Sequence, residues 1–115
     1  MTTVFSVDSG RCSKKTIIKA NAAAGGKIAV KIETNCENIK RYSEVLKEVS
    51  IKDFTNPIIS NPIYITASST GVGPECLVPC AVVSTVWTEA GWVSKNLLKQ
   101  FKHACITYME PEETV

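Results

Sequence analysis

Apolar and polar positions alternate in the first third of the chain, as they do in β-strands. Residues 3–7 predict a short edge strand that ends at a turn over residues 8–10. Residues 16–20 and 27–33 flank two consecutive glycines, and the second segment places its isoleucines and valine on one face. We therefore expect an edge strand followed by a β-hairpin.

A helical pattern follows the hairpin. Thr34 and Glu37 have the spacing of a capping box, in which the two side chains satisfy each other's unpaired backbone amides. Apolar residues then recur every three or four positions, at Ile39, Tyr42, Val45, Leu46 and Val49. We expect a helix that begins at this box, packs one face on the sheet and ends at Ser50.

The second half of the chain is more broken. Residues 51–74 hold three prolines among many small polar residues, which predicts an irregular connection. Within it, residues 63–65 fit either a short strand or a helical turn. Residues 76–90 predict a buried helix, with Pro79 in its first turn and Gly91 as its C-terminal cap.

The last elements are a short helix over residues 94–102 and a closing strand over residues 105–108. The predicted class is α+β, with a small antiparallel or mixed sheet, the order β-β-β-α-loop-α-β, and helices on one face. Residues 1–109 are expected to form a single domain, and residues 110–115 a frayed acidic tail.

Composition and charge exclude several functional classes. The chain has 44% apolar and 21% charged residues, as globular domains do, and a net charge of +2 without a clustered basic stripe. Nucleic acid is therefore not an expected partner. The sequence has no apolar run of membrane-spanning length and no signal-peptide pattern at its start, so we expect a cytoplasmic protein without a membrane partner.

Five cysteines are the most informative residues. In a reducing compartment an odd number of cysteines indicates reduced thiols, metal ligands or redox groups before disulfides. Cys12, Cys36 and Cys76 each fall at the boundary of a predicted element. The start of a helix favours thiolate over thiol, and thiolate is the form that binds metals and attacks electrophiles. This places Cys36 and Cys76 best for chemistry.

Three interpretations of these thiols stay open: a metal or cluster site, inert packing, and thiol redox or transfer chemistry. Compact zinc and ferredoxin spacings are missing from the sequence, so a metal site has to be assembled from distant positions. The possible fourth ligands are Cys80, His103, Cys105 or a non-protein group. Cys80 and Cys105 also fit packed fillers, and His103 a surface or partly buried residue.

A cysteine before a hairpin, one opening the next helix and one opening a later helix resemble the pattern of the iron-sulfur scaffold proteins of the IscU/NifU type. The resemblance covers about residues 10–90 and implies that Cys12, Cys36 and Cys76 are three ligands of zinc or a cluster. Where that family has Gly and Asp after its first cysteine, Ser13 and Lys14 stand here. The aspartate that promotes cluster release in the scaffolds has no counterpart.

The chain also resembles a small cysteine-containing family of archaea and other anaerobes. The features shared with it are Gly10-Arg11-Cys12, Asn35-Cys36-Glu37 and Cys76-Leu77-Val78-Pro79. The last of these keeps half of the Cys-Pro-x-Pro motif of sulfur-transfer proteins, in which a helix-terminal thiolate carries a persulfide.

These observations predict a metal-binding protein that holds zinc or an iron-sulfur cluster. We expect it to be an accessory in cluster or sulfur metabolism with a protein partner, rather than an enzyme that turns over a substrate. The alternatives are a thiol-based sulfur-transfer or redox protein using a cysteine at a helix start, and a structural domain with packed cysteines.

Overall fold

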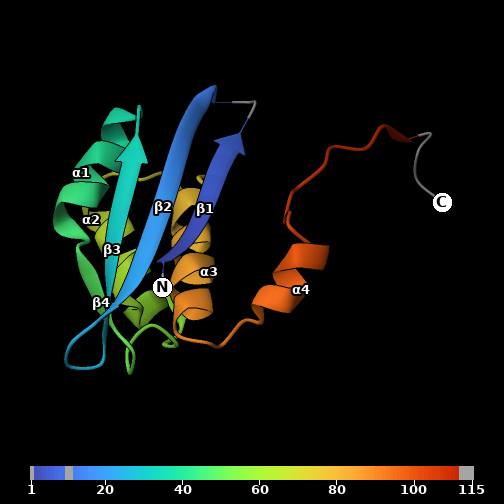
Figure 1. The fold of residues 1–115 in the computed structure, drawn as a ribbon. Helices are drawn as coiled ribbons and strands as arrows, with labels where there is room; N and C mark the ends of the chain where they lie inside the picture. Colours follow the sequence, from blue (N-terminus) through green and yellow to red (C-terminus); the bar gives the residue numbers. More distant parts are fainter. Residues whose placement is uncertain (1, 10–11, 112–115) are drawn as a thin grey trace.

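A four-stranded antiparallel sheet forms one layer of the protein in the computed structural model, which describes residues 2–9 and 12–111 (Figure 1). The strands lie in the order in which they occur along the chain. They are β1 (Thr2–Ser9), β2 (Lys14–Ala23), β3 (Lys27–Thr34) and β4 (Glu48–Ser50). The predicted edge strand and hairpin are confirmed.

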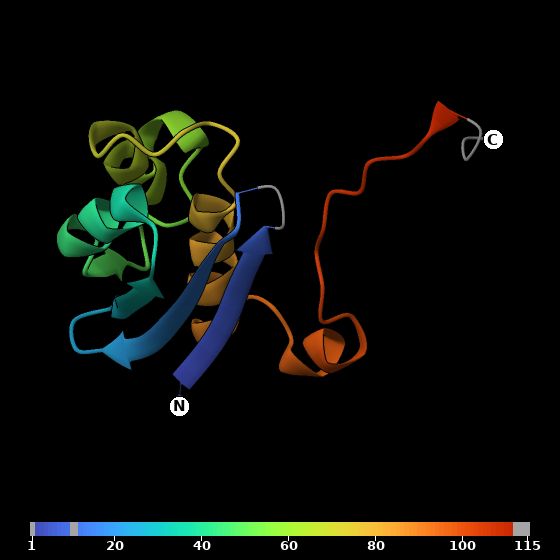
Figure 2. The same ribbon diagram turned by 90° about the horizontal axis from the view of Figure 1, so that it is seen from above.

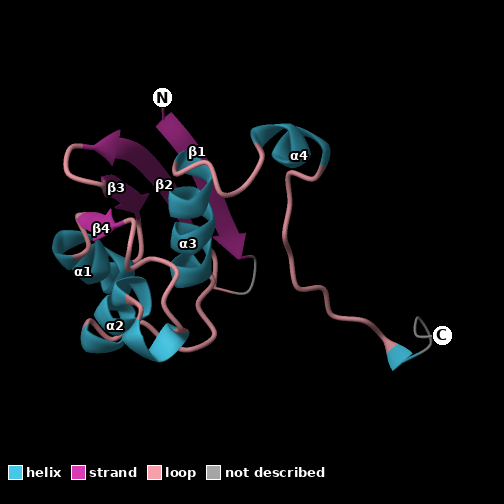
Figure 3. Ribbon diagram, turned by 90° about the horizontal axis from the view of Figure 1, so that it is seen from below, coloured by secondary structure: helices cyan, strands magenta, loops and turns pink. Residues whose placement is uncertain are grey.

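Helices form the second layer, on one face of the sheet (Figures 1 and 3). The helical elements are α1 (Glu37–Val45), the 3-10 turn η1 (Ile58–Ser60), α2 (Pro62–Ser69), α3 (Val78–Glu89) and α4 (Lys95–Gln100). Of these, α3 packs on β1 and β2 and α1 packs on β3, whereas α4 lies apart from the sheet. The α+β class with helices on one face is confirmed.

Two glycines make the β2–β3 hairpin possible. Gly25 and Gly26 have φ values of 77° and 68°, which lie in the left-handed region that side chains with a Cβ rarely adopt. The turn sets the register in which Ala23 lies opposite Lys27. In that register, four apolar residues of the two strands face the helices and are buried, namely Ile18, Ala20, Ile28 and Val30.

The first helix differs from its prediction at both ends. Thr34 is the last residue of β3, and Cys36 is the N-cap of α1, so the predicted capping box is wrong. At the other end the helix stops at Val45, which is 61% exposed rather than buried. The chain then returns to the sheet as β4, where Val49 is buried opposite Ile28. For residues 48–50, strand pairing with β3 is preferred over the continued helix that the apolar spacing predicts.

The connection between α1 and α3 holds a regular element, because residues 62–69 form α2. Asn61 is fully enclosed there and caps the helix, since its side-chain oxygen accepts a hydrogen bond from the Ile63 amide at 3.0 Å. Its side-chain amide donates to the Phe54 carbonyl at 2.9 Å. The helical alternative for residues 63–65 is therefore the correct one.

The central helix α3 begins at Val78, two residues later than predicted, and its end is as predicted. Gly91 has a φ of 85°, and its amide donates to the Thr88 carbonyl. The following amide, of Trp92, donates to the Trp87 carbonyl at 2.8 Å. This pair of bonds is a Schellman motif, which accounts for the glycine at this position.

Beyond α3, the short helix over residues 94–102 is confirmed as α4, but the closing strand over residues 105–108 is wrong. Residues 101–110 form neither helix nor strand and are exposed. A strand needs a hydrogen-bonding neighbour, and in this part of the chain none lies alongside. Of the predicted acidic tail, residues 112–115 fall outside the described part, as does Gly10 of the first predicted turn.

The helix and sheet layers are joined by buried side chains and by one carboxylate. Tyr42, Phe54, Val82 and Val86 are fully buried between the layers. At the far end of α3, Glu89 accepts hydrogen bonds from the Thr3 hydroxyl at 2.7 Å and from the Ala22 amide at 3.2 Å. The start of α3 is consequently fixed at the opposite end of the sheet. Within the described ranges, no helix is long and apolar enough to cross a membrane.

Candidate functional site

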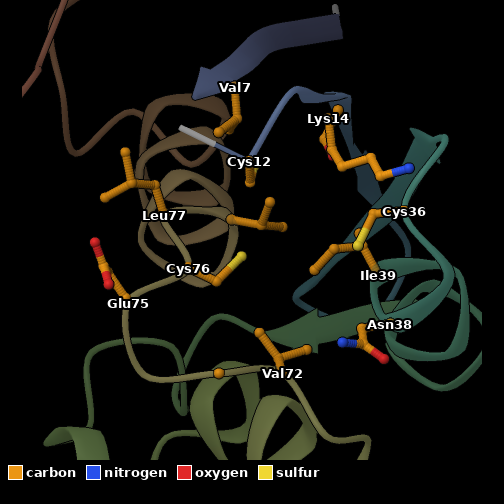
Figure 4. Close-up of a pocket in the computed structure, with 13 residues that line it drawn as sticks. Val7, Cys12, Lys14, Cys36, Asn38, Ile39, Val72, Glu75, Cys76 and Leu77 are labelled. Atoms are coloured by element: carbon orange, nitrogen blue, oxygen red, sulfur yellow. The ribbon is translucent and has the colours of Figure 1, made fainter. Parts of the chain in front are cut away.

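Three cysteines line one cavity of about 370 Å³ at the end of the sheet where α1 and α3 begin (Figure 4). Cys12 comes from the β1–β2 connection, Cys36 from the junction of β3 and α1, and Cys76 from the segment before α3. We call this cavity the cysteine pocket. Its other lining residues are Val7, Lys14, Thr16, Asn38, Ile39, Val72, Gly73, Glu75, Leu77 and Val78.

The backbone around Cys36 leaves its sulfur available to the pocket. The Cys36 amide donates to the Thr34 hydroxyl at 3.1 Å, and its carbonyl accepts the Lys40 amide at 2.9 Å, which begins α1. The sulfur itself makes no capping hydrogen bond to the helix. An N-cap position is normally filled by a residue whose side chain caps. A cysteine here gives up that capping bond and presents a thiol to the cavity (Figure 4).

Cys76 lies in a turn closed by its own amide, which donates to the Gly73 carbonyl at 3.1 Å. Burial raises the pKa of the Cys76 thiol above its ordinary value, and a hydrogen bond from the Val78 amide lowers that pKa in part. Negative charge at Cys36 and at Cys12 adds to the rise. Cys36 and Cys12 are therefore close enough to influence the ionisation of Cys76.

Cys12 is exposed at the rim of the pocket, in the connection between β1 and β2 as the sequence predicts. The next residue, Ser13, has a φ of 53°, in the left-handed region. For a residue other than glycine this conformation is uncommon and occurs mainly in tight turns. The turn directs Cys12 back toward the cavity between β1 and the start of α3 (Figure 4).

The three thiols surround the cavity rather than converge on one point. Among residues 2–9 and 12–111, no group of three or more His, Cys, Asp or Glu side chains is placed to hold a single metal ion. The cavity at the centre of the three cysteines is instead wide enough for a group of several atoms. Its walls include Ile39, Val72 and Leu77, which limit the access of water from the helix side.

None of the predicted fourth ligands lines the cysteine pocket. Cys80 lines a different cavity, and His103 and Cys105 lie in the exposed segment beyond α4. The packed-filler interpretation of Cys80 and Cys105 is also wrong, because both are exposed. His103 lies at the surface, as expected for a residue that is not a ligand.

A family profile described as a family of unknown function, DUF6951, matches residues 3–101. The chain belongs to this family. The matched region contains all three cysteines of the pocket and Cys80, whereas His103 and Cys105 lie beyond it. No curated protein and no solved structure matches the chain. The resemblance to the scaffold proteins of the IscU/NifU type stays a prediction.

Sequence reasoning missed three polar residues that line the pocket in this DUF6951 member. They are Lys14, Asn38 and Glu75. Each stands next to or two positions from one of the three cysteines, and this proximity is the signal that could have identified them. They give the mouth of the pocket one amide and one charge of each sign.

A second cavity, of about 400 Å³, lies on the opposite side of α3 and is aromatic. We call it the aromatic pocket; Cys80, Tyr64, Phe54 and Trp87 are among its lining residues. The Trp87 indole donates to the Phe54 carbonyl at 3.2 Å, and the two rings are 6.2 Å apart between centroids. This interaction ties the aromatic pocket to the core.

Proposed function

We propose that this DUF6951 member binds a metal centre, zinc or an iron-sulfur cluster, in the cysteine pocket. The ligands are the thiolates of Cys12, Cys36 and Cys76. In this proposal the protein is a binding module or accessory in cluster or sulfur metabolism, located in the cytoplasm, and not an enzyme that turns over a substrate. The observation that carries it is the meeting of three cysteines, distant in the sequence, around one cavity.

The donor set fits both kinds of centre. Thiolates are the usual ligands of structural zinc and of iron-sulfur clusters. A zinc ion needs all its ligands at about 2.3 Å, so that sulfurs meet at a point. A cluster spans several ångströms and is held by cysteines spread around it. Because the three thiols surround a cavity of about 370 Å³, the geometry favours the cluster over the single ion.

The electrostatics of the pocket also favours a bound cation. Burial disfavours the thiolate of Cys76, and the neighbouring thiols oppose a second negative charge. A metal centre supplies positive charge that holds bound thiols deprotonated. The cysteines would hold the centre, and Lys14, Asn38 and Glu75 would contact its surroundings. Thiolates that are costly to form in the metal-free pocket are therefore stabilised once a metal centre is bound.

Three cysteines leave one coordination position without a thiolate from the pocket walls. In the proposal this position is filled by a non-protein group or by a side chain of a partner protein. The IscU/NifU resemblance supports such a partner in cluster or sulfur metabolism. Lys14 stands where those scaffolds have the aspartate that promotes cluster release, so the proposed role is holding a centre rather than delivering it quickly.

Sulfur transfer or thiol redox chemistry is the weaker alternative. It requires a cysteine that is readily ionised at neutral pH, because thiolate is the attacking species. Cys76, the cysteine of the partial Cys-Pro-x-Pro match, has a raised pKa and stands before α3 rather than in its first turn. A thiol with a raised pKa is a slow nucleophile at neutral pH, because little of it is present as thiolate.

The proposal is tested with the full chain purified without oxygen. We expect stoichiometric zinc or iron by elemental analysis, or visible absorption after reconstitution with iron and sulfide. The triple variant C12S/C36S/C76S should lose the centre. The matched control C80S/C105S removes the two thiols outside the pocket and should keep it. A protein that holds neither metal before or after reconstitution, or loses it equally in both variants, contradicts the proposal.

A further inference from the structure

The chain leaves the two-layer body after α4 as an extended arm, residues 101–111. Figures 1 and 2 show it running away from the sheet, and every residue in it is exposed. It is nevertheless rich in large apolar side chains. Phe101 is 67% exposed, Ile106 75% and Tyr108 79%. Transfer of such side chains from water to an apolar contact is favourable, so an arm of this composition is suited to a partner.

The arm has the pattern of a strand without a neighbour. Ile106 and Tyr108 are two positions apart, so that in an extended chain they lie on one face, with Cys105 and Thr107 on the other. β-Branched and aromatic residues of this kind are common in strands. The sequence predicts a strand here for this reason, and the described chain offers it nothing to pair with.

A matching edge exists at β1. This strand of eight residues is the outermost of the described sheet, with β2 on one side and no strand on the other. A long uncovered edge exposes a row of backbone amides and carbonyls that can pair with another chain. On the helix-facing side of β1, Phe5 and Val7 are only half-buried, also two positions apart. They lack the apolar neighbours that one further strand would supply.

We propose that the arm of one copy adds as a strand to the β1 edge of a second copy. Ile106 and Tyr108 then continue the apolar layer formed by Phe5 and Val7. The occupant is a second copy, because the arm carries the strand pattern and is directed away from its own body. Two copies can exchange arms reciprocally, which closes a symmetric dimer and leaves neither β1 edge uncovered.

Light scattering on the full chain across a dilution series, with chelator present, tests the dimer separately from metal binding. In an added edge strand, the amides of alternate residues face the neighbouring strand and those between face solvent. Proline removes an amide. Of the two variants I106P/Y108P and C105P/T107P, one should therefore be monomeric and the other should remain dimeric.

Because the arm is exposed, neither pair of prolines should alter folding, and unchanged far-ultraviolet circular dichroism provides the control. A full chain that is monomeric throughout the series overturns the proposal. So does a dimer that survives both pairs of prolines. If both variants are monomers, the arm associates by its apolar side chains without a ladder, and strand addition is also overturned.

Discussion

Cys76, in the turn before α3, and Cys80, in the first turn of α3, are four positions apart in the sequence, yet they line different cavities. Cys76 lines the cysteine pocket with two other thiols, and Cys80 lines the aromatic pocket beside Tyr64 and Trp87. Residue type and the nearest element are the same for both. The difference lies in which distant segments pack beside each cysteine. Whether a cysteine joins a cluster of thiols in this protein therefore depends on tertiary contacts rather than on its position near a helix start.

The two pockets also differ in how they are held. The aromatic pocket is tied to the core by ring contacts, such as Phe54 against Trp92 at 5.7 Å between centroids, and by the Trp87 hydrogen bond. The cysteine pocket is lined by turns and element ends, and none of its lining residues is aromatic. We therefore expect substitutions in the aromatic pocket to act on folding and those in the cysteine pocket to act on binding.

The largest effect on stability is expected for Phe54→Ala. Phe54 is fully buried, and its removal leaves a cavity between α3 and the turn before α2. Large-to-small changes of this kind cost about 3–5 kcal/mol of unfolding free energy, measured by urea titration. The control Ile59→Ala removes a side chain that is 89% exposed and should change it by less than about 0.5 kcal/mol. Equal losses of unfolding free energy in the two variants would contradict the structural role given to the aromatic pocket.

Single serine variants of Cys12, Cys36 and Cys76 come next. Each removes one thiolate ligand, so the affinity of the reconstituted protein for its metal centre should fall roughly a hundredfold. Loss of a residue that only hydrogen-bonds to a metal ligand already lowers affinity by up to about this factor. Competition with a chelator measures it. The matched variant Cys80→Ser should leave the affinity unchanged. A Cys80 effect as large as the others would mean that the two pockets are not chemically distinct.

Tyr42 lies in the core, and removal of its hydroxyl should have an intermediate effect. It is buried, its hydroxyl donates to the Ile63 carbonyl at 3.0 Å, and burial with the charges of Tyr64 and Cys76 raises its pKa far above the ordinary range. Tyr42→Phe removes this buried hydrogen bond to α2 and should cost about 0.5–1.5 kcal/mol in urea unfolding. An unchanged midpoint would show that the carbonyl finds another donor.

The smallest effect concerns the reactivity of Cys76 in the metal-free protein. Because burial raises its pKa, the pH at which alkylation of Cys76 reaches half its maximal rate should lie above that of the same cysteine in urea. The folded state then holds the proton more tightly, so this group's stabilising contribution is fully present below the unfolded pKa and is lost as pH rises from there through the folded pKa. Mass spectrometry of the peptide that contains Cys76 reads the rate. A midpoint below that in urea would favour the sulfur-transfer alternative.

Local patterns were sufficient for much of the fold. The alternation around Gly25-Gly26 and the glycine that ends α3 are local features, and both were predicted correctly. The end of α1 was not, because residues 48–50 leave a continuous helical period to pair with β3, and pairing between distant segments leaves no mark in that period. Residues 105–108 have the alternation of a strand, but within the described chain no other strand pairs with them.

The candidate site was predictable in part for the same reason. Cys12, Cys36 and Cys76 were singled out because each lies at an element boundary, and such boundaries gather at the ends of a sheet. Which end, and which other residues gather there, depends on the packing of α3 across β1 and β2. Local patterns do not predict which of Cys80, His103 and Cys105 reaches the pocket, since the orientation of Cys80 on α3 and the course of the chain after α4 are set by tertiary structure.

The central claim is that three thiols form one site from which the other two cysteines are excluded. Alkylation of the full chain with and without bound metal, read at each cysteine by mass spectrometry, tests this most directly with internal controls. The account predicts that metal protects Cys12, Cys36 and Cys76 together and leaves Cys80 and Cys105 as reactive as before. Protection of only one of the three, or equal protection of all five cysteines, would contradict it.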